Sequence, residues 1–198
     1  MTPAKLPITD QLRQPIQFET QLRGFPLRFQ STWGVFSPRE VDEGSRLLLE
    51  HIKIAENADC FDLGCGYGVL GLTLAKLAPK GQTIMADKDF VAVDYANQNA
   101  ALNQINNAKA ILSNGLEQLS DQTFDLIVSN IPAKVGNEML SLFLHDAYHH
   151  LKPNGQFVVV TINGLRHYMK RNFNEVFGNY KKLKQGKNYT VASATKLS

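Results

Sequence analysis

Short apolar runs alternate with longer amphipathic segments over most of this chain. Short apolar runs bounded by glycine, proline or asparagine are typical of buried strands, and apolar positions that repeat every three to four residues indicate helices. We therefore predict strands over residues 60–63, 82–86, 108–112, 124–129 and 156–162. Helices are predicted over residues 69–77, 90–102, 137–151 and 165–177.

This alternation predicts a parallel sheet covered by helices on both faces. The final segments, residues 180–183 and 189–194, flank a polar turn around Gly186 and predict an antiparallel hairpin. The expected fold class is therefore α/β and Rossmann-like, with a seven-stranded, mostly parallel sheet that ends in a C-terminal antiparallel hairpin.

The first 36 residues do not follow this pattern. Residues 1–15 are polar, contain three prolines and predict a loose arm. Residues 16–20, 26–30 and 33–36 predict short extended pieces. We therefore divide the chain into an N-terminal arm with a small β extension, residues 1–36, and a main domain, residues 37–198.

A helix is predicted to begin at Ser37. In Ser37-Pro38-Arg39-Glu40 the serine matches an N-cap, the proline suits the first helical position, and Glu40 suits the capping box. An apolar stripe then continues to about Ile54.

Composition narrows the class of protein. The 198 residues are 43% hydrophobic and 20% charged, which is ordinary for a soluble globular chain. No run approaches the ~18 apolar residues of a membrane span, and the N-terminus lacks the apolar core of a signal peptide, so a cytoplasmic location is expected. The net charge of +3 permits a nucleic-acid partner without requiring one. The oligomeric state is not specified, and a monomer fits the sequence.

No metal site is expected. Cys60 and Cys65 are the only cysteines, and their spacing matches no zinc pattern. His145 and His149 are four residues apart on a predicted helix, but no third ligand accompanies them.

The most informative stretch follows the first strand of the alternating region. Asp62 is the one polar residue of the apolar run 60–63, and Gly64, Gly66, Gly68 and Gly71 follow it, the last of them inside a helical pattern. Glycines allow a sharp turn and a close approach to a ligand, and the N-terminus of a helix favours an anionic ligand group. A plain glycine turn without a ligand is the structural alternative.

Two cofactors compete for this stretch. Gly66, Gly68 and Gly71 fit the dinucleotide pattern G-x-G-x-x-G, with Asp87 at the end of the next strand. The fuller pattern, Asp-x-Gly-x-Gly-x-Gly, resembles motif I of class I S-adenosylmethionine-dependent methyltransferases, in which the acid can hold the ammonium group of the cofactor. NAD has no such group for Asp62 to hold.

Polar residues also follow the other predicted strands, whose carboxyl ends form the ligand-binding edge in such folds. Asp87 can accept both hydroxyls of a ribose, with a helix N-cap as the alternative that Asp89 fills better. Asn114, followed by Gly115, can contact an adenine amino group, and an Asx-turn is its alternative.

Asn130-Ile131-Pro132-Ala133 follows the fourth strand. The Asn130 side-chain oxygen and the Ile131 carbonyl can accept the two hydrogens of an exocyclic amino group and so stabilise its developing positive charge. Pro132 holds Ile131 extended and thus fixes the direction of that carbonyl. A plain turn before a helix is the structural alternative.

Together these motifs resemble the methyltransferase small domain family, which includes RsmC-type ribosomal RNA guanine-N2 methyltransferases. The resemblance rests on Gly34-Val35-Phe36-Ser37 with Asp42-x-Gly44, on residues 62–71, and on Asn130-Ile131-Pro132, and it spans about residues 17–196. It implies a class I methyltransferase fold, S-adenosylmethionine as cofactor, and transfer of a methyl group to guanine N2 in ribosomal RNA. It also implies that the turn at Phe36 and Ser37 closes over the methionine end of the cofactor.

The expected site follows from the residues and the resemblance. Catalysis is assigned to Asn130, Ile131 and Pro132. The cofactor is assigned to Phe36, Ser37, Asp62, Gly64, Cys65, Gly66, Gly68, Asp87, Lys88, Asn114, Gly115 and Asn130.

The acceptor leaves alternatives open. Ala133 stands where the family pattern has an aromatic residue that stacks on the target base, and Ile131 replaces its first proline. Trp33, Phe36 and Tyr168 are candidate replacements for the missing ring. Lysines and arginines on the last helix and hairpin could contact RNA phosphates, and a solvated surface is the alternative. Three alternatives remain open. The methyl acceptor could be a protein amide or a small molecule, or the chain could be a non-catalytic module that binds the cofactor or RNA.

Overall fold

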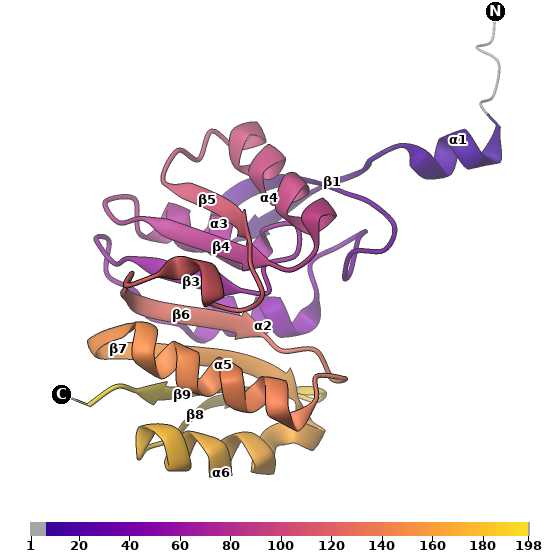
Figure 1. Ribbon diagram of the computed structural model, residues 1–198. Helices are drawn as coiled ribbons and strands as arrows, with labels where there is room; N and C mark the ends of the chain where they lie inside the picture. The colour runs from indigo at the N-terminus through magenta and orange to yellow at the C-terminus, as the bar shows by residue number, and fades with distance from the viewer. Residues whose placement is uncertain (1–6, 198) are drawn as a thin grey trace, which may run out of the picture.

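The computed structural model describes residues 7–197, which form two sheets (Figure 1). The small one is an antiparallel hairpin of β1 (Ile16–Leu22) and β2 (Phe25–Ser31). The large one has seven strands in the order β5-β4-β3-β6-β7-β9-β8. Its strands are β3 (Cys60–Leu63), β4 (Thr83–Asp87), β5 (Ala108–Leu112), β6 (Phe124–Asn130), β7 (Leu151–Ile162), β8 (Lys181–Gln185) and β9 (Tyr189–Thr195).

Five neighbouring strands of the large sheet are parallel, and β9 runs antiparallel to β7 on one side and to β8 on the other. The predicted fold class is therefore confirmed, including the C-terminal antiparallel hairpin. The sequence produces this parallel sheet because its apolar strands alternate with amphipathic helices. Each central strand can then bury both of its faces under helices.

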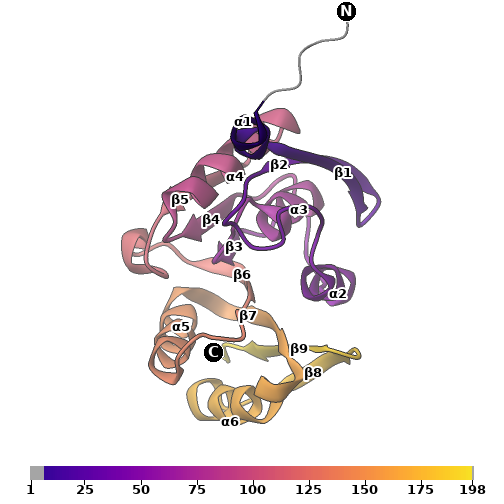
Figure 2. The same cartoon turned by 90° about the vertical axis from the view of Figure 1, so that its right-hand side faces the viewer.

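Helices cover both faces of the sheet (Figure 2). One core contains side chains of α2 (Glu43–His51), α3 (Val69–Leu77) and α4 (Phe90–Leu102). The other contains side chains of α5 (Asn137–His150), α6 (Arg166–Phe177) and a short 3₁₀ turn at Glu117–Leu119. None of the helices described is long and apolar enough to cross a membrane.

The strand order creates one reversal point. From β3 the chain moves outward through β4 to β5, and then returns to place β6 on the other side of β3. The loops after β3 and β6 consequently leave the sheet in opposite directions, which opens a crevice above their carboxyl ends. The functional site is expected in this crevice.

The start of the second helix differs from the prediction. Asp42 is its N-cap and accepts a hydrogen bond from the Ser45 amide, so α2 begins at Glu43 and not next to Ser37. Ser37 has a φ of +47°, and its hydroxyl donates to the Glu40 carbonyl. The capping-box pattern was therefore misleading, because Asp42 satisfies the helix terminus instead.

The N-terminal segment also departs from expectation. Part of the predicted loose arm forms helix α1 (Ile8–Arg13), which buries no side chain, while residues 1–6 lie outside the described part. Residues 33–36 form turns and bends, and not the expected extended piece. The β1–β2 hairpin agrees with the extended segments predicted before them.

Buried Asn99 on α4 connects the hairpin to the large sheet. Its Nδ2 donates to the carbonyls of Gln30 and Tyr67, and its Oδ1 accepts from the Gln30 amide at 2.7 Å. A single side chain thereby fastens β2 and the glycine loop to the same helix.

The sheet has two edge strands, β5 and β8. Three of the four exposed side chains of β8 are lysines, and Leu183 is half-buried. The strand is held by its pairing to β9.

Candidate active site

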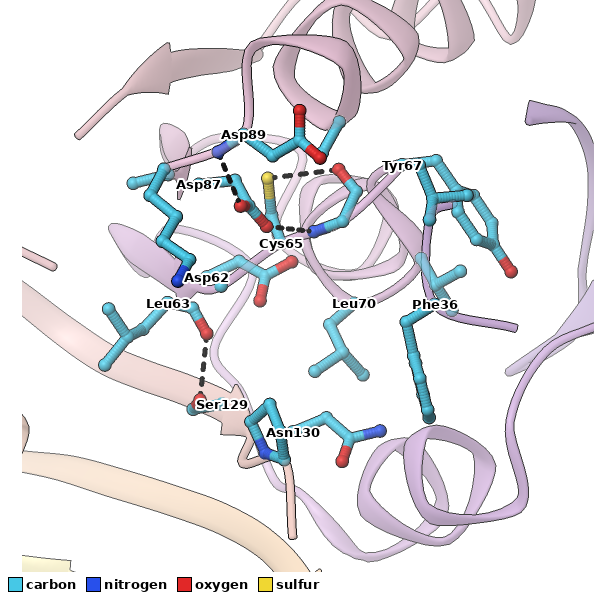
Figure 3. Close-up of a pocket in the computed structure, with 18 of the residues that line it drawn as sticks. Phe36, Asp62, Leu63, Cys65, Tyr67, Leu70, Asp87, Asp89, Ser129 and Asn130 are labelled. Carbon is cyan, nitrogen blue, oxygen red and sulfur yellow. Dashed lines mark hydrogen bonds between the residues drawn. The ribbon is translucent and has the colours of Figure 1, made fainter. Parts of the chain in front are cut away.

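A cavity of about 380 Å³ lies in the crevice above the carboxyl ends of the parallel strands (Figure 3). Its size falls within the range of small-molecule sites. Its walls come from the loops after β3, β4, β5 and β6, from the segment before α2, and from the first turns of α3 and α5.

Most of the residues predicted for the site meet around this cavity. The lining includes Phe36, Ser37, Asp62, Gly64, Cys65, Gly66, Asp87, Lys88, Asn114, Gly115, Asn130 and Pro132. Gly68 and Ile131 are outside it. Gly68 is the N-cap of α3 with a φ of +97°, and Ile131 places its side chain in the core while its amide donates to the Val160 carbonyl.

Asp62 is the most unusual residue of the site, because its carboxylate is fully buried. Its Oδ2 accepts a hydrogen bond of 2.7 Å from the Gly71 amide in the first turn of α3, whereas Oδ1 has no partner. Burial raises the pKa of Asp62 to about 7, the hydrogen bond from Gly71 lowers it, and the charge of Asp87 raises it further. A buried acid with one unsatisfied oxygen is suited to a ligand that brings a hydrogen-bond donor or a positive charge.

The glycine loop is shaped by a second carboxylate. Asp87 accepts from the Gly66 amide through Oδ2 at 2.9 Å and from the Asp89 amide through Oδ1 at 3.0 Å. Gly66 has a φ of +53°, which a side chain would disfavour. Asp89 caps α4 through the Val91 amide, as the sequence suggested, so Asp87 is left at the cavity wall.

Cys65 is buried and forms no disulfide. Burial raises the pKa of its thiol well above the ordinary value, and the charges of Asp62 and Asp87 raise it further. This shift disfavours the thiolate, which is the form of cysteine that acts as a nucleophile. Within the described part of the chain, no group of three or more His, Cys, Asp or Glu side chains is arranged to hold a metal ion.

The loop after β5 contributes polar groups at the far wall. Asn114 is exposed and donates through Nδ2 to Glu117, while the Ser113 hydroxyl donates to the Gly115 carbonyl. These bonds give the loop its own turn structure, and Asn114 still lines the cavity.

Asn130 lies at the end of β6, on the opposite side of β3 from Asp87. Its Nδ2 donates to Asp42 and to Ser45, so its oxygen is the free end of the amide. The preceding residue, Ser129, donates to the Leu63 carbonyl at 2.8 Å and ties β6 to β3 at the crevice.

Phe36 approaches the cavity from the segment before α2 and is 65% exposed. This segment is attached to the glycine loop by Tyr67, whose hydroxyl lies 2.9 Å from the Ser37 carbonyl and 3.2 Å from the Glu40 carbonyl. Tyr67 packs edge-on against Phe29 of the hairpin. The hairpin thus supports the wall of the cavity that carries Phe36.

Several lining residues were not singled out from the sequence. Asp42 and Ser45 come from the start of α2, and Met139 and Phe143 come from α5. In the sequence, the Asp42-x-Gly44 pattern indicated only the family resemblance and gave no role for Asp42 in the cavity. The helical period shows which residues share a face, but not which of those faces lines a crevice.

The arrangement has a definite chemical character. Carboxylates stand at the ends of β3 and β4, and an amide stands at the end of β6. The wall between them is apolar, with Leu70, Val69 and Phe36. The site can therefore hold a ligand with a cationic or polar end and an apolar body, next to an acceptor for N–H groups.

A model of the methyltransferase small domain family matches residues 26–193 of this chain. Among relatives, the ribosomal RNA small subunit methyltransferase C of Hamiltonella defensa is 34% identical over 166 residues, which cover 82% of this chain and 48% of the relative. The uncharacterised protein YbxB of Bacillus subtilis is 37% identical over 142 residues, which cover 71% of each chain.

A solved structure is also similar. The Thermus thermophilus 16S rRNA N2 G1207 methyltransferase RsmC, in complex with AdoMet and guanosine, superposes with a TM-score of 0.83 and 30% identity. The match covers 92% of this chain and 50% of that protein. The chain thus spans about half the length of the methyltransferase C and RsmC relatives.

The Asp62–Gly71 contact generates a prediction about stability. A Cβ at position 71 would lie 2.3 Å from Met85 Cγ and 3.1 Å from Asp62 Oδ2, so Gly71→Ala overpacks a buried site. We expect it to lower the free energy of unfolding in urea by about 1–3 kcal/mol. Gly164→Ala is the control, because its Cβ would meet only the Ile162 Cδ1 at 3.7 Å, an ordinary contact, and it should change stability by less than about 0.5 kcal/mol. Equal urea midpoints for the two variants would contradict the packing argument.

Proposed function

This chain belongs to the methyltransferase small domain family, and from that premise we propose that it is an S-adenosylmethionine-dependent N-methyltransferase acting on guanine N2 in ribosomal RNA. One observation carries the proposal: Asp62 and Asn130 line the same cavity from the ends of two neighbouring strands. Asp62 is a buried carboxylate with one oxygen that lacks a hydrogen bond, and Asn130 is an amide whose NH₂ group is already bonded within the protein.

The residues present fit S-adenosylmethionine. The unpartnered Oδ1 of Asp62 supplies the acceptor that an amino-acid ammonium group needs. Asp87 and the loop at Asn114 would hold the ribose and adenine, and Phe36 with Leu70 would cover the apolar portion. When bound, this cofactor supplies a methyl group on a positively charged sulfur, which is already activated for transfer.

The protein's own part in the reaction is then positioning and charge stabilisation. We assign one N–H of the acceptor amine to the free oxygen of Asn130. The other is assigned to the backbone carbonyl of Ile131, the residue between Asn130 and Pro132 of the cavity wall, whose own side chain lies in the core. Both interactions strengthen as positive charge develops on that nitrogen. Since a methylated amine loses its proton readily, no strong base is required, and orientation supplies most of the rate enhancement.

Support for an RNA acceptor comes from relatives and from charge. The relatives of known activity methylate ribosomal RNA, and the similar solved complex contains guanosine. At the cavity edge of the sheet, Arg166 begins α6, and Lys187 lies in the β8–β9 turn that Asn163 holds through two carbonyls. Neither cation belongs to an ion pair of the described residues. Cations without an ion-pair partner on the same edge of the sheet as the cavity suit RNA phosphates. A ribosomal acceptor implies a cytoplasmic location.

Phe36 is the best candidate to replace the aromatic residue missing at Ala133. Of the three aromatic candidates, Phe36 lines the cavity, whereas Trp33 lies under the Arg39 guanidinium and Tyr168 donates to the Asn137 carbonyl. An exposed ring at the mouth of the cavity can stack on a base with about 1–3 kcal/mol of stabilisation.

The cofactor assignment predicts an effect on binding. Asp62→Asn removes the negative charge from the site with little change in shape, and we expect about 10-fold to 100-fold weaker binding of S-adenosylmethionine in calorimetry. Asp94→Asn is a matched control, because Asp94 is exposed on α4 and contacts Gln98. A wild-type protein that binds neither S-adenosylmethionine nor S-adenosylhomocysteine would refute the proposed function.

The raised pKa of Asp62, about 7, predicts a pH dependence of that binding. Below this pH the free protein must lose a proton from Asp62 before it can hold an ammonium group. Affinity should therefore rise with pH between about 5.5 and 7, by up to about tenfold per pH unit, with release of a proton. Calorimetry in two buffers of different ionisation enthalpy measures that proton. Asp62→Asn should abolish the slope, and a flat wild-type profile would contradict the assignment.

The acceptor assignment predicts an effect on turnover alone. Asn130→Ala removes one N–H acceptor and should lower kcat by about 10²-fold, while the affinity for S-adenosylmethionine changes by less than about twofold. The assay follows labelled methyl groups into ribosomal RNA, with protein and small-molecule fractions counted in parallel. Label found only in protein or metabolites would overturn the RNA acceptor.

A further inference from the structure

Residues at the start of α2 hold the Asn130 side chain by two hydrogen bonds. Its Nδ2 donates to Asp42 Oδ2 at 2.8 Å and to the Ser45 hydroxyl at 3.0 Å. Ser45 is buried and Asp42 is half-buried. These contacts join strand β6 to a helix that begins 87 residues earlier in the chain, since β6 ends at Asn130 and α2 begins at Glu43.

These two hydrogen bonds fix which end of the amide meets α2. An ionised carboxylate can only accept hydrogen bonds, so Asp42 must meet the NH₂ group of Asn130. A flipped amide would place Asn130 Oδ1 against Asp42 Oδ2 at the distance that now separates donor and acceptor, 2.8 Å. The lost bond and the repulsion together exclude that orientation. The amide oxygen is thereby directed away from α2 and is left without a hydrogen bond from the described residues.

Asp42 is itself held by two further donors. The Ser45 amide donates to its Oδ2 at 3.2 Å, as the N-cap of α2, and the Tyr189 hydroxyl donates to its Oδ1 at 3.2 Å. Gly44 makes room for this contact, because a Cβ there would lie 2.8 Å from Asp42 Oδ2 and 3.0 Å from the Tyr189 ring. The carboxylate therefore has one orientation, and it transmits that orientation to Asn130.

We propose that Asp42 is a positioning residue that acts through Asn130: its carboxylate fixes the amide so that the oxygen faces the acceptor amine. This inference rests on the proposed function for the role of that oxygen. It also explains why this chain has asparagine at position 130, since aspartate there would face a second carboxylate.

The test exchanges the two side chains. Asn130→Asp places two carboxylates in contact and should lower kcat on ribosomal RNA by about 10²-fold at pH 8, where a shared proton is disfavoured. In the double variant Asp42→Asn with Asn130→Asp, the amide and the carboxylate are restored with their positions exchanged. We expect kcat to return to within about tenfold of the wild type, with KM for S-adenosylmethionine unchanged in both variants.

A second variant separates positioning from helix capping. Asp42→Ser keeps a good N-cap but is too short to hold Asn130, so it should lower kcat by about tenfold or more while the urea midpoint stays near that of the wild type. Glu43→Gln is the matched control, because Glu43 is the adjacent exposed acid and contacts Asn188 and not Asn130. It should leave kcat unchanged.

A measurement without catalysis keeps the two proposals distinguishable. The side-chain ¹⁵N–¹H₂ signals of Asn130, identified by their loss in Asn130→Asp, should exchange slowly with water in the wild type and about tenfold faster in Asp42→Ser. A double variant no faster than Asn130→Asp, a wild-type kcat in Asp42→Ser, or equal exchange rates would each overturn the positioning role. If wild-type protein methylates no RNA, the proposed function fails, and the exchange rates still decide whether Asp42 orients the amide.

Discussion

The hydrogen bond from the Gly71 amide to Asp62 is the interaction on which the site depends. It joins the end of β3 to the first turn of α3 and places a carboxylate where solvent does not reach. A buried charge is costly unless it is paired, and here only one oxygen is satisfied within the protein. The N-terminus of α3 offsets part of the cost through its unpaired amides and dipole. A ligand that donates to the second oxygen would remove more of this cost.

This constraint also determines the packing around the loop. Helix α3 can approach Asp62 closely because position 71 has no Cβ, and Met85 fills the space beside it. The glycine loop between them is fixed by Asp87 from β4 and by Tyr67 packed against the hairpin. Stability and function are therefore connected at this point, since the same contacts that close the core also shape the cavity wall.

Much of the fold was predictable from the sequence because strands and helices carry their own periodicity. The seven strands, the helices on both faces and the terminal hairpin all follow from local patterns, and the strand-end rule brings Asp62, Asp87 and Asn130 to one edge. The local sequence misplaced the start of α2, because two residues could serve as its N-cap. Ser37 matched the capping-box pattern, but Asp42 is the N-cap in the structure. Short α1 was missed because its six residues are too few to show a helical period, and it buries no side chain.

Within the site, the contacts between distant segments were not predictable. The bond between Asn130 and Asp42 joins residues 88 positions apart, and the bonds of Asn99 to Gln30 join residues 69 apart. Such pairs have no spacing rule, because they arise only when the sheet has placed α2 and the hairpin beside it. The sequence indicates which residues carry the chemistry, whereas tertiary packing decides how each side chain is turned.

The lysines of β8 have a consequence for the behaviour of the protein at high concentration. An open edge strand offers unpaired backbone groups that a second molecule can join, and this is a common route to aggregation. Here Lys181, Lys182 and Lys184 are exposed on the edge strand itself. Two copies that met along it would bring rows of like charge together and would have to strip water from each ammonium group. Edge strand β8 thus completes the sheet and disfavours its extension by a strand of a second molecule.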